Sequence, residues 1–507
     1  MSLELELGLI PKRNDIHAHT QMFKSRNASL RPTSGSSQQG GVRPSAPHGV
    51  DESERTSDVK STRTTGTGAT ATKALLPSDI IDDAVSVASV SHAGSDAAAH
   101  PHDEDDYPEG GLRAWLVVFG CWLALFASLG LMNVLATFDI YVKHLPDHSA
   151  ATVGGVISVY SLLSFALGIY VGPLFDRYGP RYLIMAGTAC LVVSLIIVSI
   201  STKHWHLIVS FGILSGLGSA FLFTPSIAAI GHFFQKRRGL ATGVATTAGS
   251  VSAVVFPFMV EKLFRKVGWP WAVRALALIC LAVTIGANFL IRSRLSPVAR
   301  VVTKIPRPEP RIFATQGFSL TVLALFFMQF AAFLPLSYLS AFVLSKGFSN
   351  EFSFDVITIL NAASAFGRVA GGFLADLIGP FNASIIFTFL TSVVCFAIWL
   401  PVGATKGGLI AFALIFGFTS GSNISLMPVS IGKLCPTRDY GRYFGTAYTL
   451  ISLAVLTAIP VTNAVLTKNN GDYWGIVVTS GSLYAASAVV FCAARVSIVG
   501  WGFWTAF

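Results

Sequence analysis

The stretch LNAASAFGRVAGGFLAD, Leu360 to Asp376, places a permanent cation, Arg368, inside a long apolar run. An unpaired arginine at a bilayer centre costs ~2.5 to 17 kcal/mol, depending on how the cost is measured. Arg368 lies eight residues before Asp376, which is about 12 Å along a helix that rises ~1.5 Å per residue. The spacing therefore predicts a cation near the middle of a membrane.

Two polar residues share the predicted helix face of Arg368. Asn361 and Ser364 precede it by seven and four residues, a spacing that brings side chains onto one side of a helix. A polar stripe on an apolar helix is expected to face a cavity rather than lipid, and the planar fork of arginine suits a carboxylate. We interpret these residues as an anion-binding site. The alternative is that Arg368 braces a neighbouring helix through backbone carbonyls.

The composition points to a protein that crosses a membrane many times. Of 507 residues, 52% are hydrophobic and 12% are charged, whereas soluble domains carry roughly 25% charged residues. From Gly111 onward, apolar runs of the ~20 residues that span a bilayer follow one another. They predict an all-α membrane protein with twelve transmembrane helices, near residues 112–137, 153–174, 182–202, 206–230, 239–262, 271–292, 315–344, 353–378, 380–401, 407–430, 442–466 and 474–497.

The segment before the first predicted helix has a different composition. Residues 1–108 are rich in Ser, Thr, Gly and Ala, so we expect a disordered, cytosolic tail. Residues 1–112 hold 10 basic and 16 acidic residues, while residues 113–507 hold 26 and 10. The basic excess thus belongs to the membrane part and does not indicate nucleic-acid binding. The predicted partners are a lipid bilayer and a small molecule; the oligomeric state is left open.

Loop charges predict the orientation. With a cytosolic tail, the inside loops hold 14 Lys and Arg residues and the outside loops hold eight, so the positive-inside rule places both termini in the cytosol. The longest inside loop, 293–314, is the predicted linker between two six-helix halves, residues 109–292 and 315–507.

A repeated motif supports this division. GPLFDRYGPR begins at Gly172 and GFLADLIGP begins at Gly372, and both read G-x-x-x-D-x-x-G-P at equivalent loops. Repeated halves with a binding site between them are typical of secondary transporters. The candidate gating residues are Gly172, Asp176, Arg177, Gly179, Arg181 and Asp376.

These motifs resemble those of the major facilitator superfamily. GPLFDRYGPR is similar to its loop signature between helices two and three. PEGGLRAW, from Pro108, and HFFQKRRGLATGVATTAG, from His232, are similar to the segments entering helices one and five of monocarboxylate transporters, most closely the fungal branch. The resemblance covers the chain from about residue 108 to the end. It implies alternating access, with the charges of the loop motif locking the halves together on the inside.

The chain departs from the proton–lactate members at two positions. Asn133 stands where those members carry a lysine, and Ser364 stands where they carry an aspartate. We therefore expect a hydrophobic carboxylate or secondary metabolite as substrate rather than lactate. The predicted substrate-binding residues are Arg368, Ser364, Asn361 and Asn133.

The sequence thus predicts a secondary transporter of a small organic anion, with metabolite efflux as one direction. The plasma membrane is the expected location, with a vacuolar or vesicular membrane as the alternative. The rival function is a transporter-like nutrient sensor that signals through its tail. No HExxH, paired aspartates or Ser–His set indicates an enzyme, and no CxxC pair indicates a metal site. We expect no cofactor.

Overall fold

The computed structural model describes residues 107–142, 150–294, 310–402 and 405–502. Within these ranges, twelve helical spans are long and apolar enough to cross a membrane. This confirms the predicted all-α fold with twelve transmembrane helices. The predicted tail falls outside the described ranges except for its last two residues, and so does most of the predicted linker.

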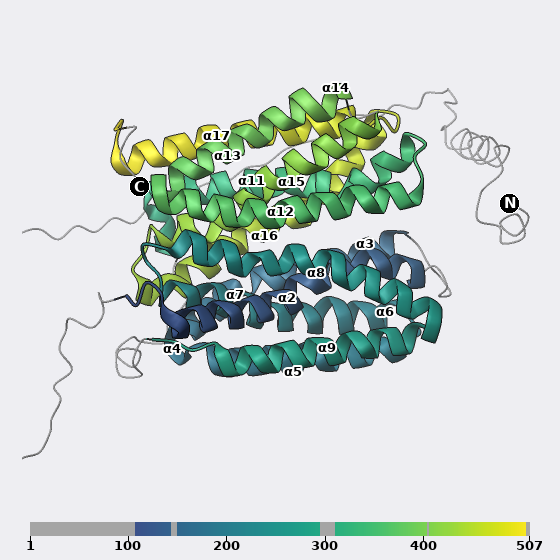
Figure 1. Cartoon of the computed structure of the whole chain (residues 1–507), viewed down its shortest axis with the longest axis horizontal. Helices are drawn as coiled ribbons and strands as arrows, with labels where there is room; N and C mark the ends of the chain where they lie inside the picture. Colours follow the sequence, from purple (N-terminus) through teal and green to yellow (C-terminus); the bar gives the residue numbers. More distant parts are fainter. Residues whose placement is uncertain (1–106, 143–149, 295–309, 403–404, 503–507) are drawn as a thin grey trace, which may run out of the picture. The chain divides into compact units, whose positions relative to one another are not determined.

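The first six spans occupy the purple-to-teal part of the chain in Figure 1. They are α2 (Gly111–Val142), α3 (Ala150–Ala166) with α4 (Gly168–Tyr178), α5 (Pro180–Ile200), α6 (His204–Leu207) with the π-helical η2 (Ile208–Ser215) and α7 (Gly216–Gly231), α8 (Arg238–Val267), and α9 (Trp269–Leu290).

The last six spans occupy the green-to-yellow part (Figure 1). They are α11 (Gln316–Ser345), α12 (Asn350–Ile378), α13 (Pro380–Val394) with the π-helical η4 (Cys395–Trp399) and α14 (Leu400–Val402), α15 (Lys406–Gly432), α16 (Tyr440–Lys468), and α17 (Trp474–Val499). Two short 3-10 turns, η3 (Pro310–Ala314) and η5 (Thr437–Asp439), precede α11 and α16.

The two copies of the repeated motif build the same turn. Gly179 follows α4 and Gly379 follows α12, with φ of 76° and 91°, a left-handed region that glycine adopts readily. Each glycine N–H bonds to the carbonyl four residues earlier. Pro180 and Pro380 then begin α5 and α13, where a missing N–H loses no helical hydrogen bond.

Large apolar side chains lie on the outside of the bundle as well as within it. Phe289 and Phe366 are each 74% exposed, while Trp399 and Tyr160 are almost fully buried. A monomer in water rarely exposes apolar surface on this scale, but a bilayer solvates such side chains. The outer surface therefore fits a lipid environment.

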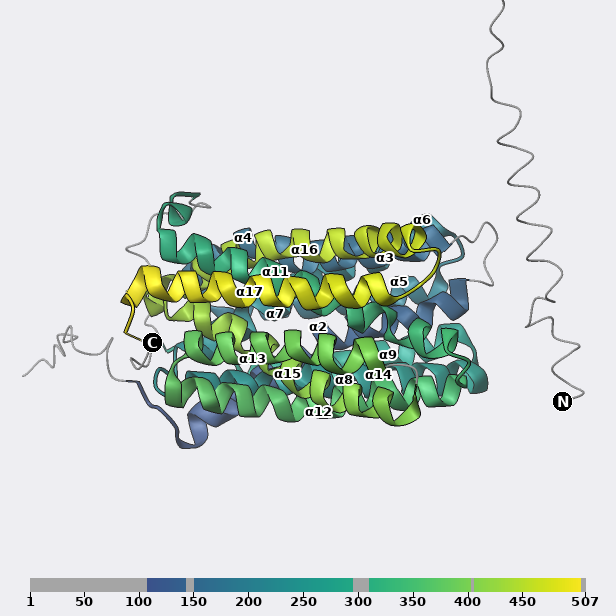
Figure 2. The same ribbon diagram turned by 90° about the horizontal axis from the view of Figure 1, so that it is seen from above.

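The first six spans contact the last six chiefly through two interfaces. α16 packs on α3 and α4, and α12 packs on α8; smaller contacts join α15 to α8 and α16 to α7. Figure 2 places α3, α4 and α16 along one edge of the bundle and α8 and α12 along the opposite edge. We call the end of the bundle that holds Tyr107, Asp176, Arg238 and Asp376 the tail end.

Candidate functional site

Arg368 lies where α12 meets α8, and its side chain is 7% exposed. Its Nη1 donates a hydrogen bond to the carbonyl of Thr246 in α8, and its Nε donates to Ser364 Oγ at 3.4 Å. Ser250 of α8 donates to the same Ser364 oxygen at 3.3 Å. A Cβ on Gly249 would lie 3.0 Å from Nη1, so the glycine leaves room for the guanidinium. The arginine is therefore held between helices of the two six-span groups.

The structure does not bring the two predicted asparagines to Arg368. Asn361 donates to the carbonyl of Ile357 at 3.0 Å, and Asn133 donates to the carbonyl of Leu129 at 2.9 Å. Among the described hydrogen bonds, only Ser364 of the predicted set contacts the arginine. The bond from Arg368 to the Thr246 carbonyl fits the alternative in which the arginine braces a neighbouring helix. The anion-binding role of the four residues stays a prediction.

An aromatic ladder on α16 was not predicted. Tyr440, Phe444 and Tyr448 pack along one face with tilted rings, whose centroids are 5.8 Å and 4.3 Å apart. Tyr448 also lies 5.8 Å from Phe165 of α3 and 5.4 Å from Phe223 of α7. These three residues are four apart in the sequence, a spacing that places side chains on one face of a helix and could have predicted the ladder.

The aromatic ladder runs between two buried cations. Arg238 packs over the Tyr440 ring with its guanidinium carbon 3.9 Å from the ring centroid. At the other end, Tyr448 lies in the neighbourhood of Arg368. A cation over an aromatic ring is stabilised by the ring quadrupole. The ladder therefore links the tail end with the centre of the bundle.

The repeated aspartates cap helices of the opposite group. Asp176 accepts hydrogen bonds from the backbone N–H groups of Gly441 and Arg442, at 2.9 and 2.8 Å. Asp376 accepts from Gly239 and Leu240, at 2.7 and 2.8 Å. A carboxylate at a helix N-terminus satisfies orphan donors and favours the helix dipole. The motif thus builds two matching locks, α4 on α16 and α12 on α8.

Glycines allow the backbones to approach beside both locks. A Cβ on Gly172 would lie 2.0 Å from the carbonyl oxygen of Gly441, and a Cβ on Gly372 would lie 2.1 Å from that of Gly239. Real side chains do not tolerate these distances. The tail end is therefore closed by direct contact of helix backbones.

The predicted gating arginines lie away from these locks. Arg177 packs over the ring of Tyr178, 5.2 Å from its centroid, and Arg181 is exposed. The described hydrogen bonds to Asp176 come from backbone amides rather than from these arginines. A third cation, Arg238, donates to the carbonyl of Gly432 at 3.1 Å and so joins α8 to α15.

Asp376→Asn is expected to speed amide exchange in the first turn of α8. Hydrogen bonds to charged acceptors contribute about 1.5–3 kcal/mol, so loss of the charge should accelerate exchange at Gly239 and Leu240 roughly tenfold or more. Hydrogen–deuterium exchange of the peptide covering this turn measures the effect. The control is Asp439→Asn, which weakens a partly exposed ion pair with Arg442 at 3.3 Å and should change exchange of this peptide less than about threefold. Equal exchange in both variants would contradict the lock.

The segment before α2 also contacts both groups of helices. Glu109 accepts hydrogen bonds from the N–H groups of Gln235, Lys236 and Arg237, at 2.9, 2.6 and 3.1 Å. Tyr107 Oη shares a hydrogen bond of 2.5 Å with Thr437 Oγ1. The acidic residue of the PEGG motif therefore organises the turn that enters α8.

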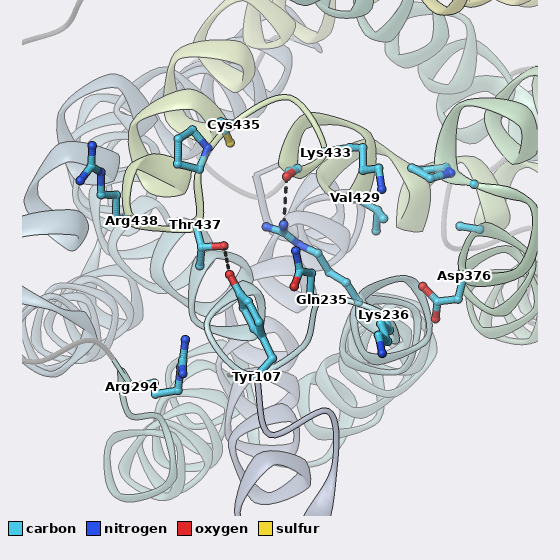
Figure 3. A pocket seen from close by; sticks show the side chains of 16 residues that line it. Tyr107, Gln235, Lys236, Arg294, Asp376, Val429, Lys433, Cys435, Thr437 and Arg438 are labelled. Atoms are coloured by element: carbon cyan, nitrogen blue, oxygen red, sulfur yellow. Dashed lines mark hydrogen bonds between the residues drawn. The ribbon is translucent and has the colours of Figure 1, made fainter. Parts of the chain in front are cut away.

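A cavity of about 760 Å³ opens beside this segment at the tail end. Figure 3 shows Tyr107 pointing toward Thr437, with Lys236, Arg294, Lys433 and Arg438 around the cavity. Among the residues that the structure describes, no three His, Cys, Asp or Glu side chains group to hold a metal ion. The arrangement consists of a central cation, two capping locks and a basic cavity.

A family model for the Major Facilitator Superfamily matches residues 120–459. The chain belongs to the major facilitator superfamily. This confirms the family resemblance found in its motifs; the narrower resemblance to monocarboxylate transporters stays a prediction. The protein is an integral membrane transporter of small molecules.

Fungal relatives and solved structures agree with this assignment. The transporter is 36% identical to "MFS-type transporter 1" of Ophiocordyceps sp., over 79% of this chain and 89% of that protein. It is 34% identical to the "Fujikurins efflux protein" of Gibberella fujikuroi, over 82% of this chain and 88% of that protein. The human organic anion transporter MFSD10 shares its fold, with a TM-score of 0.59 at 15% identity, over 75% of this chain and 100% of that one. These comparisons give no support to the sensor alternative.

Proposed function

We propose that this transporter exports a hydrophobic organic anion, of the carboxylate or secondary-metabolite class, by alternating access. The observation that carries the proposal is Arg368, a buried permanent cation between α8 and α12. A guanidinium binds carboxylates through its planar fork, and a cation at membrane depth is expensive unless it serves a function. The efflux function of the fujikurins relative supports the outward direction.

The chemistry around Arg368 supports a large, partly aromatic substrate. Phe165 and Phe223 of the first six spans pack on Tyr448 of the aromatic ladder, and Tyr448 lies in the neighbourhood of Arg368. Binding sites for organic molecules combine apolar walls with a few polar groups that fix orientation. In this proposal Arg368 and Ser364 bind the anionic group, while Asn361 and Asn133 contact the substrate further along α12 and α2.

The structure corresponds, in the proposed cycle, to a state closed at the tail end. We infer that this end is cytosolic, with both termini in the cytosol, because the loop charges favour that orientation. Residues 109–292 and 315–507 would move as two halves joined by the linker 293–314, as repeated halves do in transporters. The plasma membrane is the proposed location, since an exporter acts at the cell boundary.

An untargeted comparison of organic acids inside and outside cells tests the proposal. Cells with the full-length protein should show a several-fold higher outside-to-inside ratio for one or a few hydrophobic acids than cells without it. A non-transporting membrane protein expressed at the same level is the control. The measurement also gives the direction of net flux.

Two results would overturn parts of the proposal. If the outside-to-inside ratio of neutral metabolites depends on the protein and that of acids does not, the protein is a transporter but its substrate is not an anion. If acids accumulate inside instead, import replaces export.

A further inference from the structure

Residues 107–110, directly before α2, form a segment that we call the strap. Both oxygens of the Glu109 carboxylate accept hydrogen bonds from the turn that enters α8, and the Glu109 N–H donates to the carbonyl of Phe233 at 3.2 Å. Glu109 has a φ of 47°, a left-handed conformation that a residue with a Cβ keeps only where surrounding contacts compensate its cost. One end of the strap is therefore fixed to the start of α8.

Tyr107 fixes the other end of the strap to both groups of helices. Its ring lies under the guanidinium of Arg294, whose carbon is 4.9 Å from the ring centroid, and Arg294 follows α9 of the first six spans. Its hydroxyl shares the 2.5 Å hydrogen bond with Thr437 Oγ1 in η5, which precedes α16 of the last six spans. Figure 3 shows this bond at the wall of the cavity. The strap thus joins the two groups of helices through this pair of hydroxyl groups.

Both anchors of the strap lie directly before a capping lock. Thr437 precedes by four residues the first amide that Asp176 caps, in α16. The turn held by Glu109 ends two residues before the first amide that Asp376 caps, in α8. A separation of the two groups of helices at the tail end would therefore break both locks together with the bond between Tyr107 and Thr437.

We propose that the strap is a latch that couples the two locks and holds the tail end closed, with the Tyr107 hydroxyl as its release point. The hydroxyl meets Thr437 at a high effective concentration, because the strap is already anchored at Glu109. A single hydrogen bond contributes modestly to stability, so the latch favours closure without preventing opening. The proposal rests on the alternating access proposed above, but not on the substrate or on the direction of transport.

Cys435 reports on opening of the tail end, because it lines the cavity together with Tyr107 and lies two residues before Thr437. Burial raises the pKa of the Cys435 thiol to about 12. Since the thiolate is the nucleophile, alkylation by N-ethylmaleimide at about pH 8 is slow in the closed state. Mass spectrometry of the peptide that holds Cys435 follows the reaction in the full chain. Hydrogen–deuterium exchange at Gly239 and Leu240 gives a second measurement, at the lock on α8.

Tyr107→Phe tests the latch by removing the hydroxyl and retaining the ring. It should speed both the alkylation of Cys435 and the exchange of the two α8 amides roughly twofold to tenfold, the range that one hydrogen bond supports. Tyr178→Phe is the matched control, since the Tyr178 ring also lies under an arginine, at 5.2 Å, and its hydroxyl makes no hydrogen bond among the described residues. The control should change either rate less than about twofold.

A double-mutant cycle assigns the effect to the two hydroxyl groups. Thr437→Val should speed both measurements as much as Tyr107→Phe does, and the combined variant should be no faster than either single variant, because both substitutions remove the same bond. Thr437→Ser retains the hydroxyl and should stay within about twofold of the unsubstituted chain. This variant separates loss of the hydrogen bond from misfolding at position 437.

Three results would overturn the latch. Tyr107→Phe could behave as its control, or the factors of the two single variants could multiply in the combined one. Alkylation of Cys435 could also become faster while the α8 amides exchange as before, since the hydroxyl pair would then only pack η5.

Gly172→Val distinguishes failure of the latch from failure of alternating access. It forces apart the backbone contact of α4 and α16 and should speed alkylation whatever the strap does. If Gly172→Val speeds alkylation and Tyr107→Phe does not, the latch alone is wrong. If neither variant speeds alkylation, alternating access is wrong as well.

Discussion

Arg368→Gln should lower export of the anionic substrate roughly tenfold to hundredfold at matched surface amounts. Glutamine places its amide nitrogen near the position of the arginine Nε, which donates to Ser364, but it carries no charge, and a hydrogen bond to a charged partner contributes about 1.5–3 kcal/mol. Arg368→Lys retains the charge without the planar fork and should transport at an intermediate rate. Transport into inverted vesicles gives KM and the maximal rate for each variant.

A neutral analogue of the substrate separates the two roles of Arg368. If the guanidinium binds the anion, a methyl ester of the acid should be transported equally by the wild-type protein and Arg368→Gln. Ser250→Ala is the matched control, since it removes a contact to Ser364 in the same interface and leaves the charge in place. If Arg368→Gln transports the acid normally, Arg368 does not bind the anion and only braces α8 against α12.

Gly172→Val is expected to reduce transport to background by preventing closure of the tail end. The new side chain would have to occupy space 2.0 Å from the Gly441 carbonyl oxygen. Overpacking costs about 1–3 kcal/mol or more, so the closed state should lose roughly tenfold to hundredfold in population relative to the open state. Transport assays measure the loss of transport. Alkylation of Cys435, which lines the cavity at the tail end, measures the loss of closure and should become faster.

The control for Gly172→Val lies in the same membrane span. A Cβ on Gly155 of α3 would meet no atom of the described residues within 4 Å, so Gly155→Val tests the loss of a glycine without a clash there. It should transport at nearly the wild-type rate. If Gly172→Val transports as well as Gly155→Val, the close backbone approach is not required for the cycle.

Local patterns in the sequence were sufficient for the helices and for the repeat. Apolar runs placed the third span at 182–202 and the structure has Pro180–Ile200, because span length is set by bilayer thickness. The G-x-x-x-D-x-x-G-P repeat predicted two equivalent loops, and the Gly-Pro turns after α4 and α12 follow from the same local backbone preferences. Local spacing also placed Ser364 beside Arg368, since both are on one helix.

Long-range partners could not be predicted from spacing. Asp176 binds amides 265 and 266 residues away, and Arg368 binds the carbonyl of Thr246, 122 residues away. These contacts depend on how α4 meets α16 and how α12 meets α8, which no single helix specifies. The sequence instead indicated Arg177 and Arg181 as gating residues because they belong to the same loop motif as Asp176. The π-helical turns η2 and η4 were missed because they leave the apolar pattern intact.

The capping locks depend on few side chains. Each lock has one side-chain member, Asp176 or Asp376, and its partners are main-chain amides, which every amino acid except proline supplies. Sequence drift at Arg442 or Leu240 therefore cannot remove the donor, whereas a Cβ on Gly441 would lie 2.5 Å from Asp176 Oδ1 and would displace the carboxylate. Each lock thus needs one aspartate and one glycine for its hydrogen bonds to persist. A charge-swap rescue, the usual test of an ion pair, has no counterpart here.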